Sequence, residues 1–371
     1  MKRLLAVILG AAVLAPVASA AAPRPHARAW LVENAATGEV LAAHAASARL
    51  PIASITKLMT VLVTLDHAKL DDVVTVSPRT SRIGESTIDL RPGERIAVRD
   101  LIEAALIQSA NDAASALAEH IGGGSVPRFV ALMNAKARAL GLADTHFVNP
   151  SGLDARGHYS SVRDVTTLAR IAMRKPFVRR TVRLRTEGAA GRTLHTWNDL
   201  LGGFPGVVGV KTGHTEAAGW SQVAAARGPG LTIYATVLGS PTRDRRNADL
   251  AALLAWGLSR YRVVEAIDDG RVYATATTGY GRAPVRLVAA EPLRRSIRVD
   301  RPLVERIVAP SVVSLPVAKG QRLGVVRVYA RGKLLGERPL VASESRTAPG
   351  LGGKIRWYAT RTLENAWGLI T

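Results

Sequence analysis

The chain has 371 residues, of which 47% are hydrophobic, and carries 50 basic against 29 acidic residues, a formal net charge of +21. The apolar content is enough for a packed core, which excludes a disordered chain. The absence of cysteine excludes disulfide frameworks, thiolate metal sites and cysteine nucleophiles. Nine of the 50 basic residues are lysine, so a lysine inside a motif is informative.

The first twenty residues have the features of an export signal. Lys2 and Arg3 precede an apolar run over residues 4–17, and residues 18–20 are the small residues that a signal peptidase requires. This run is shorter than the roughly 20 residues of a membrane-spanning helix, so a cleaved signal is preferred to an uncleaved anchor. We therefore expect export to the periplasm or the outer face of the cytoplasmic membrane, where nucleic acid is not a partner.

The next part of the chain is predicted to contain two strands followed by helices. The strands cover residues 29–33 and 39–44, and a helical pattern begins near Ser54. Asp100 is a plausible N-cap for the next helix, with Glu103 three residues on. Further helices are predicted over 112–121, 126–140 and 162–173.

Strand character returns after the helices, over residues 206–211, 221–226 and 231–238. A helix follows whose apolar face carries Leu250, Leu253, Leu254, Leu258 and Tyr261. Strands at both ends with helices between them predict an α+β fold in which the terminal segments share one sheet.

The character of the sequence changes near residue 263. Short apolar runs such as 285–288 and 324–329 alternate with Gly and Pro, and residues 331–333 are a candidate hairpin turn. We expect a first domain over residues 21–262 and a small all-β domain over residues 263–345.

Residues 346–371 form a linker and a tail. A helix over 354–370 would align Ile355, Ala359, Leu363, Ala366 and Ile370 on one stripe, with Trp367 beside it. This pattern suits a helix that lies in a membrane interface, and docking of the tail on its own domain is the alternative.

Three short motifs carry the candidate chemistry: Ser54-Ile55-Thr56-Lys57, Ser109-Ala110-Asn111 and Lys211-Thr212-Gly213. Residues three apart at the start of a helix are neighbours, so the Lys57 amine can take the proton of the Ser54 hydroxyl. An amine with the ordinary lysine pKa of about 10.4 would be protonated, and a second cation such as Lys211 would lower it.

The other motif residues have positions suited to binding a peptide. Ser109 and Asn111 lie in a predicted loop between helices, where a hydroxyl can relay protons and an amide can bind a peptide carbonyl. Gly213, after Thr212, would let a substrate backbone approach the strand. Taken singly, each motif also has an ordinary explanation, such as a helix cap, a surface lysine or a turn.

Two other groups of polar residues suggest no further chemistry. The eight histidines are scattered without the spacing of metal ligands, so no metal site is expected. Ser161 and Asp164 have the spacing of a capping box at the start of the next helix.

The motifs and their surroundings resemble the low-molecular-weight penicillin-binding proteins, the exported serine D-alanyl-D-alanine carboxypeptidases. The resemblance covers about residues 25–345, and the stretches that carry it are 51–60, 109–113, 147–153, 209–215, 319–324 and 339–342. It implies a β-lactamase/transpeptidase-like catalytic domain, with an antiparallel sheet and a helical cluster, followed by an all-β domain. It also implies that no cofactor is needed.

The resemblance further implies a role for each motif residue. Ser54 would attack the bond between two D-alanines of a peptidoglycan stem peptide, and Lys57 would be its general base. Ser109 would relay a proton, and the remaining side chains would bind substrate, namely Asn111, Lys211, Thr212 and Gly213. Backbone N–H groups of Ser54 and His214 would form the oxyanion hole. β-Lactam antibiotics would acylate Ser54.

Three other functions share these motifs. A β-lactamase has the same fold but needs fast deacylation, and no second carboxylate is evident in the sequence for that step. A D,D-endopeptidase would cleave cross-links instead of terminal residues. A catalytically idle envelope-binding protein would bind murein without acylation.

Overall fold

The computed structural model describes residues 5–10 and 21–367. The chain divides into two compact units, and the first covers residues 21–259. The second contains the described residues 5–10 and 260–367. Each unit has its own hydrophobic core.

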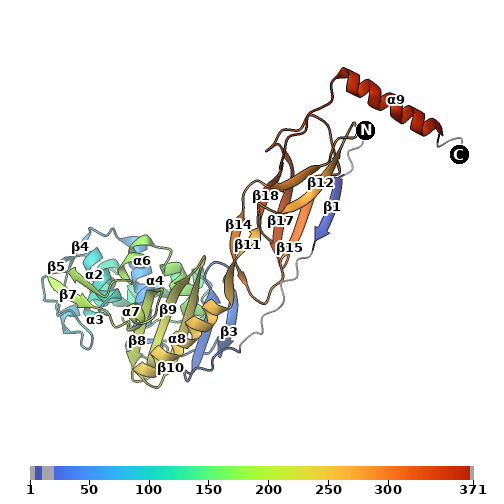
Figure 1. The fold of residues 1–371 in the computed structure, drawn as a ribbon. Helices are drawn as coiled ribbons and strands as arrows, with labels where there is room; N and C mark the ends of the chain where they lie inside the picture. The colour runs from blue at the N-terminus through green and yellow to red at the C-terminus, as the bar shows by residue number, and fades with distance from the viewer. Residues whose placement is uncertain (1–4, 11–20, 368–371) are drawn as a thin grey trace. The chain divides into compact units, whose positions relative to one another are not determined.

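The first unit is built on a five-stranded antiparallel sheet in the order β3-β2-β10-β9-β8 (Figure 1). Its strands are β2 (Ala29–Asn34), β3 (Val40–His44), β8 (Val207–Thr215), β9 (Gly219–Gly228) and β10 (Leu231–Ser240). The α+β prediction is therefore confirmed, including the pairing of the early strands with the late ones. The strand predicted to end at Lys211 continues to Thr215.

Helices cover both faces of this sheet. Thr166 of α5 (Val162–Ala172) is hydrogen-bonded to Thr236 of β10 at 2.7 Å. On the opposite face, Gly257 of α8 (Arg243–Ser259) packs directly on Ile233, because a Cβ at this glycine would lie 2.8 Å from that side chain. Residues 233 and 236 are three apart in one strand, so they point to opposite faces.

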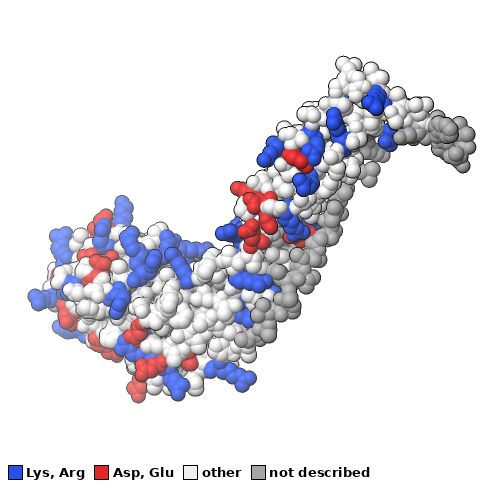
Figure 2. All heavy atoms as spheres, in the orientation of Figure 1, with Lys and Arg blue, Asp and Glu red and all other residues white. Residues whose placement is uncertain are grey.

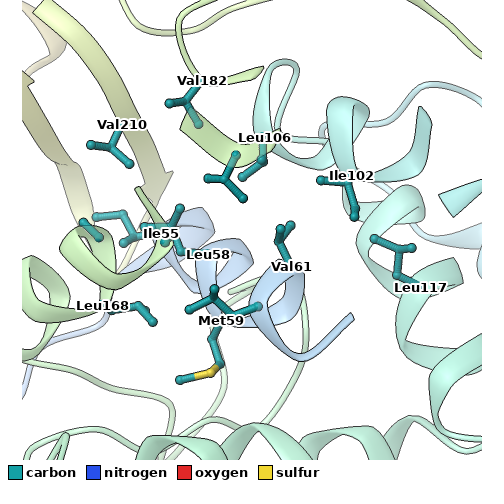
Figure 3. Packing of buried hydrophobic residues seen from close by; sticks show 14 of the residues in the cluster. Ile55, Leu58, Met59, Val61, Ile102, Leu106, Leu117, Leu168, Val182 and Val210 are labelled. Atoms are coloured by element: carbon teal, nitrogen blue, oxygen red, sulfur yellow. The ribbon is translucent and has the colours of Figure 1, made fainter. Parts of the chain in front are cut away.

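The remaining helices form a cluster around α1 (Lys57–His67), which packs against α2, α3, α4 and α5. Figure 3 shows the apolar side chains of this cluster, among them Leu58, Met59 and Leu117, which are fully buried. The other helices of the first unit are α2 (Val98–Leu106), α3 (Asn111–Ile121), α4 (Val126–Ala139), α6 (Pro176–Thr181) and α7 (Leu200–Gly203), and 3₁₀ turns cover Ala53–Thr56 and Thr80–Arg82.

Two of the predicted helix ends are wrong. Helix α2 begins at Val98 instead of after Asp100, because the N–H groups of Val98 and Arg99 bond to the carbonyls of Asp72 and Leu70. Asp100 lies in the first turn, where a carboxylate is still favourable. At the other end of the unit, Tyr261 continues the apolar stripe of α8 but begins the next strand.

Two small two-stranded sheets add to the first unit without a clear signal in the sequence. They are β4 (Val73–Thr75) with β5 (Arg95–Ala97), and β6 (Thr186–Ala189) with β7 (Arg192–His195). Tertiary contacts hold them, as when Arg192 donates to the Ile88 carbonyl and to Glu94, both at 2.6 Å. The predicted cap of α5 is confirmed, since Ser161 accepts the Asp164 N–H at 3.2 Å.

The second unit is rich in β-structure, as predicted. A seven-stranded sheet has the order β1-β15-β17-β18-β13-β12-β16, and β11 pairs with β14. The strands are β1 (Leu5–Gly10), β11 (Tyr261–Ile267), β12 (Val272–Thr278), β13 (Val285–Ala289), β14 (Leu293–Arg298), β15 (Val304–Pro310), β16 (Val312–Val313), β17 (Arg322–Ala330) and β18 (Lys333–Ala342). The predicted hairpin at residues 331–333 joins β17 to β18.

A last helix, α9 (Leu351–Trp367), ends the described chain. It confirms a helical tail, although Ile370 of the predicted stripe lies outside the described residues. Trp357 packs against Tyr280 of the same unit, with ring centroids 5.4 Å apart, and Leu351, Ile355 and Leu363 are exposed. Among the described residues, no helix is both long and apolar enough to cross a membrane.

Candidate active site

The first motif forms a tight turn at the start of α1. Ala53 to Thr56 form a single 3₁₀ turn that continues into the helix at Lys57, and Ala53 has a positive φ of 48°. Ile52 and Ile55 are fully buried and anchor this turn, whereas Ser54 is only half-buried. The fold therefore directs the hydroxyl of Ser54 toward a cleft and its neighbours into the core.

Lys57 has no access to solvent and is held by three acceptors. Its Nζ lies 2.7 Å from Ser54 Oγ, 2.7 Å from Asn111 Oδ1 and 2.8 Å from the Ser151 carbonyl. Burial lowers the pKa of this amine well below its usual value of 10.5, and the charge of Lys211 lowers it further. A neutral amine at this distance can accept the hydroxyl proton of Ser54.

The second motif lies between α2 and α3 and contacts the third. Lys211 is buried on β8, and its Nζ donates to Ser109 Oγ and to the Thr212 carbonyl, both at 2.9 Å. Burial, followed by the charge of Arg246, lowers the pKa of Lys211 to about 7. Ser109 has a φ of 67°, unusual for a residue with a side chain, so the loop holds it in a strained conformation.

Asn111 connects Lys57 to a neighbouring loop. Its Oδ1 accepts from Lys57, its side-chain amide donates to the Gly84 carbonyl at 3.3 Å, and its backbone N–H donates to the Ser86 carbonyl at 2.7 Å. It is the first residue of α3, with its N–H outside the helical hydrogen-bond ladder. The position of Asn111 in the first turn of α3 thus makes this N–H available to fix the loop.

Strand β8 is an edge strand that pairs only with β9 in the sheet, and it brings Thr212, Gly213 and His214 to the cleft. A Cβ on Gly213 would lie 2.8 Å from the Ile52 carbonyl and 3.1 Å from the Ser54 nitrogen. The sequence analysis assigned this glycine to the approach of a substrate. In the structure, it is the Ser54 turn that lies against it.

The turn that carries Ser54 is also supported from the side of residues 147–158. A Cβ on Gly152, which has a φ of 89°, would lie 1.9 Å from the Ala53 carbonyl, so only glycine fits there. The ring of His158 accepts the Val148 N–H on Nδ1 at 3.2 Å and therefore donates from Nε2 to Thr56 Oγ1 at 2.8 Å. Burial lowers the pKa of His158 to about 4, so this ring is neutral.

The cleft has a volume of about 260 Å³. Four motif residues line it, namely Ser54, Ser109, Thr212 and Gly213. The buried side chains of Lys57 and Lys211 are hydrogen-bonded to Ser54 and Ser109, and Asn111 is bonded to Lys57. The residues on its walls are Ser54, Glu85, Ser86, Ser109, Trp197, Thr212, Gly213, His214, Trp220, Arg243 and Arg246. The structure therefore brings every site residue predicted from the three motifs to one place.

Two arginines of this cleft were missed by the sequence analysis. Arg246 is 1% exposed and, like Arg243, binds the carboxylate of Asp199, at 2.9 and 2.5 Å respectively. Burial lowers the pKa of Arg246 to about 10, which leaves it charged at neutral pH. Nothing in the spacing of the arginine-rich segment 243–246 distinguishes a cleft residue from a surface one.

No group of histidines and acids comes together at the cleft. Within the described residues, the only such cluster is formed by Glu265, Asp268 and Asp269, all three exposed and in the second unit. Exposed acidic groups of this kind are common without a metal.

Comparison with known proteins agrees with this geometry. A D-alanyl-D-alanine carboxypeptidase family model matches residues 16–242, and a model for the C-terminal domain of penicillin-binding protein 5 matches residues 261–348. The chain is 32% identical to D-alanyl-D-alanine carboxypeptidase DacC of Escherichia coli K12, over 92% of this chain and 91% of that one.

Solved structures show the same relationship. Penicillin-binding protein 5 from Haemophilus influenzae superposes with a TM-score of 0.63 and 27% identity, over 89% of this chain and 100% of that one. Penicillin-binding protein D2 from Listeria monocytogenes, solved in an ampicillin-bound form, superposes with a TM-score of 0.58 and 31% identity, over 63% of this chain and 98% of that one. The chain therefore belongs to the D-alanyl-D-alanine carboxypeptidase family of low-molecular-weight penicillin-binding proteins.

Proposed function

We propose that this protein is a serine-type carboxypeptidase that removes the terminal D-alanine from peptidoglycan stem peptides through an acyl-enzyme on Ser54. The observation that carries the proposal is the 2.7 Å contact between Ser54 Oγ and the Nζ of Lys57, a buried amine whose pKa lies well below the ordinary lysine value. Membership of the family supports the substrate class.

In the acylation step, the Ser54 hydroxyl gives its proton to Lys57 as Oγ attacks the carbonyl carbon between the two D-alanines. The backbone N–H groups of Ser54 and His214 stabilise the oxyanion. The C–N bond then breaks, and the leaving amine receives a proton through Ser109, which lies 2.9 Å from Lys211 Nζ. Water later attacks the ester, releases the shortened peptide and returns the proton to Ser54.

Recognition of a free C-terminus is assigned to the cationic end of the cleft. Lys211, Thr212 and Arg246 are placed to bind the carboxylate of the terminal D-alanine, with Arg246 oriented by its contact with Asp199. Asn111 orients Lys57 and binds the amide of the substrate, while Gly213 brings β8 close to the Ser54 turn. The reaction uses neither metal nor organic cofactor.

We further propose that the protein is exported, with residues 1–20 as its signal peptide, and works in the periplasm or at the outer face of the cytoplasmic membrane. Figure 2 shows Lys and Arg side chains over the visible faces of both units, which suits an anionic envelope. The exposed Leu351, Ile355 and Leu363 of α9 support a peripheral membrane contact.

The decisive experiment is mass spectrometry of the intact protein after benzylpenicillin treatment. We expect a covalent adduct on Ser54, and the Ser54→Ala variant should form none. Folded wild-type protein without an adduct would overturn the mechanism. An adduct lost within seconds would favour a β-lactamase, and hydrolysis of cross-linked but not monomeric muropeptides would favour a D,D-endopeptidase.

A further inference from the structure

The charged residues that line the cleft differ in whether they have a counterion. Arg243 and Arg246 both bind Asp199, so their charge has a counterion. Glu85 is the single acidic residue among the described residues that line the cleft, and it is exposed. Its carboxylate has no ion-pair or hydrogen-bond partner among the side chains that the structure describes. A free carboxylate thus stands in a cleft whose other charged groups are cationic.

The backbone of Glu85 is fixed by the catalytic residues themselves. The carbonyls on both sides of it, those of Gly84 and Ser86, accept from Asn111, and the Ser86 hydroxyl donates to the Gln108 carbonyl at 2.9 Å. Glu85 itself has a φ of 65°, rarely adopted by residues other than glycine. A carboxylate mounted on this loop is held beside the reaction centre, and its charge is felt at Lys57.

Glu85 and the groups assigned to the terminal carboxylate come from different elements of the fold. The carboxylate is assigned to Lys211 and Thr212 of β8 and to Arg246 of α8, whereas Glu85 belongs to the loop bonded to Asn111, the residue assigned to the amide of the substrate. The cleft therefore offers groups of opposite charge from different elements. A peptide that fits this pattern has an anionic C-terminus and a cationic group before its two D-alanines.

We infer that Glu85 forms a subsite for a primary ammonium group on the side chain of the residue that precedes the two D-alanines. The inference rests on the proposed function, and it adds a preference: stem peptides whose diamino acid has a free amine are better substrates than those in which this amine is acylated. Acylation removes the positive charge, so it removes the attraction to Glu85.

The test compares two substrates that differ only in this charge, Nα-acetyl-L-Lys-D-Ala-D-Ala and its Nα,Nε-diacetyl form. We expect wild-type full-length protein to favour the free amine in kcat/KM by about three- to tenfold, the range of an ion pair at a partly exposed site. In Glu85→Gln the ratio should fall to about one, because only the free-amine substrate becomes slower. Glu85→Lys should invert the preference.

A matched control is Glu216→Gln, which removes an equally exposed carboxylate from the turn after β8 and should leave the ratio unchanged. If Glu85→Gln keeps the wild-type ratio, or slows both substrates equally, the subsite does not exist and Glu85 acts through Lys57 or the loop. If wild-type protein hydrolyses neither peptide, the proposed function itself fails, and this inference falls with it.

Discussion

The two lysines of the site and the cations of the β-rich unit have different kinds of partner. Lys57 and Lys211 are fully buried, and their hydrogen bonds are to hydroxyls, carbonyls and an amide, without a carboxylate. In the β-rich unit, cations such as Arg327 lie on the surface against acidic partners such as Glu337, at 2.7 Å. Burying a lysine amine without a carboxylate partner costs stability, whereas exposed ion pairs contribute little. The fold therefore accepts a loss of stability at Lys57 and Lys211, the residues to which the proposed function assigns proton transfer and carboxylate binding.

Of the substitutions that test this comparison, we expect the one at Lys57 to have the largest effect, on the rate of acylation. Replacing this residue by methionine removes the proton acceptor of Ser54, so acylation by benzylpenicillin should slow by about 1000-fold or more while the fold is retained. Stopped-flow acylation and circular dichroism measure the two effects. Arg327→Met in the β-rich unit is the control and should acylate at the wild-type rate. A Lys57→Met variant within tenfold of wild type would show that another group is the base.

The second effect concerns the tight contact between β8 and the Ser54 turn. In Gly213→Ala the new methyl group would meet the Ile52 carbonyl, so the turn must shift, and we expect about a 10- to 100-fold loss of kcat/KM. Gly279→Ala in the β-rich unit adds a methyl group to open space and should change nothing. Equal activity of the two variants would contradict the close packing.

A smaller effect should be visible in the pH dependence of stability. The folded-state pKa of Lys211 is lowered to about 7, so above pH 7 folded Lys211 has lost a proton that the unfolded chain still binds. Wild-type stability should therefore rise relative to Lys211→Met by about 2 to 4 kcal/mol between pH 7 and 10. Urea denaturation at several pH values measures this difference.

The matched substitution for that experiment is Lys333→Met, at an exposed position of the β-rich unit. Its stability difference from wild type should stay constant over the same pH range. A Lys211→Met difference that also stays constant would mean that the buried amine keeps its proton.

The smallest effect is expected on the surface of the β-rich unit. Glu337→Gln removes the partner of Arg327, and both side chains are well exposed. Calorimetry should find a shift in Tm of less than about 1 °C. A decrease in Tm of several degrees would show that this exposed ion pair stabilises the β-rich unit substantially, contrary to the comparison with the buried lysines.

The positions of the proposed site residues could be predicted from the sequence because the chemistry requires fixed local spacing. Ser54 and Lys57 must be neighbours on one helical turn, and Lys211 to Gly213 must lie on a strand. Short motifs in a fixed order were therefore enough to find them. The strands and most helices followed from periodicity in the same way.

Arg246 and Asp199 could not be predicted because their function comes from tertiary structure. They meet at the cleft only when the start of α8 lies beside the segment before β8, and neither has a local pattern. Glu85 is a similar case, since its backbone is fixed by hydrogen bonds to Asn111, 26 residues later in the chain. The predicted start of α2 was wrong for the same reason, because hydrogen bonds to the carbonyls of Asp72 and Leu70 determine where the helix begins.

The neutral ring of His158 makes the geometry of the site less sensitive to acid than the stability of the folded chain. Because its pKa lies at about 4, mild acidification leaves the hydrogen bond to Thr56, and with it the turn that carries Ser54, unchanged. The unfolded chain, however, takes up a proton on this ring below pH 6.5, which favours unfolding as the pH falls toward 4. An acidic medium should therefore reduce the fraction of folded molecules before it changes the geometry of those that remain.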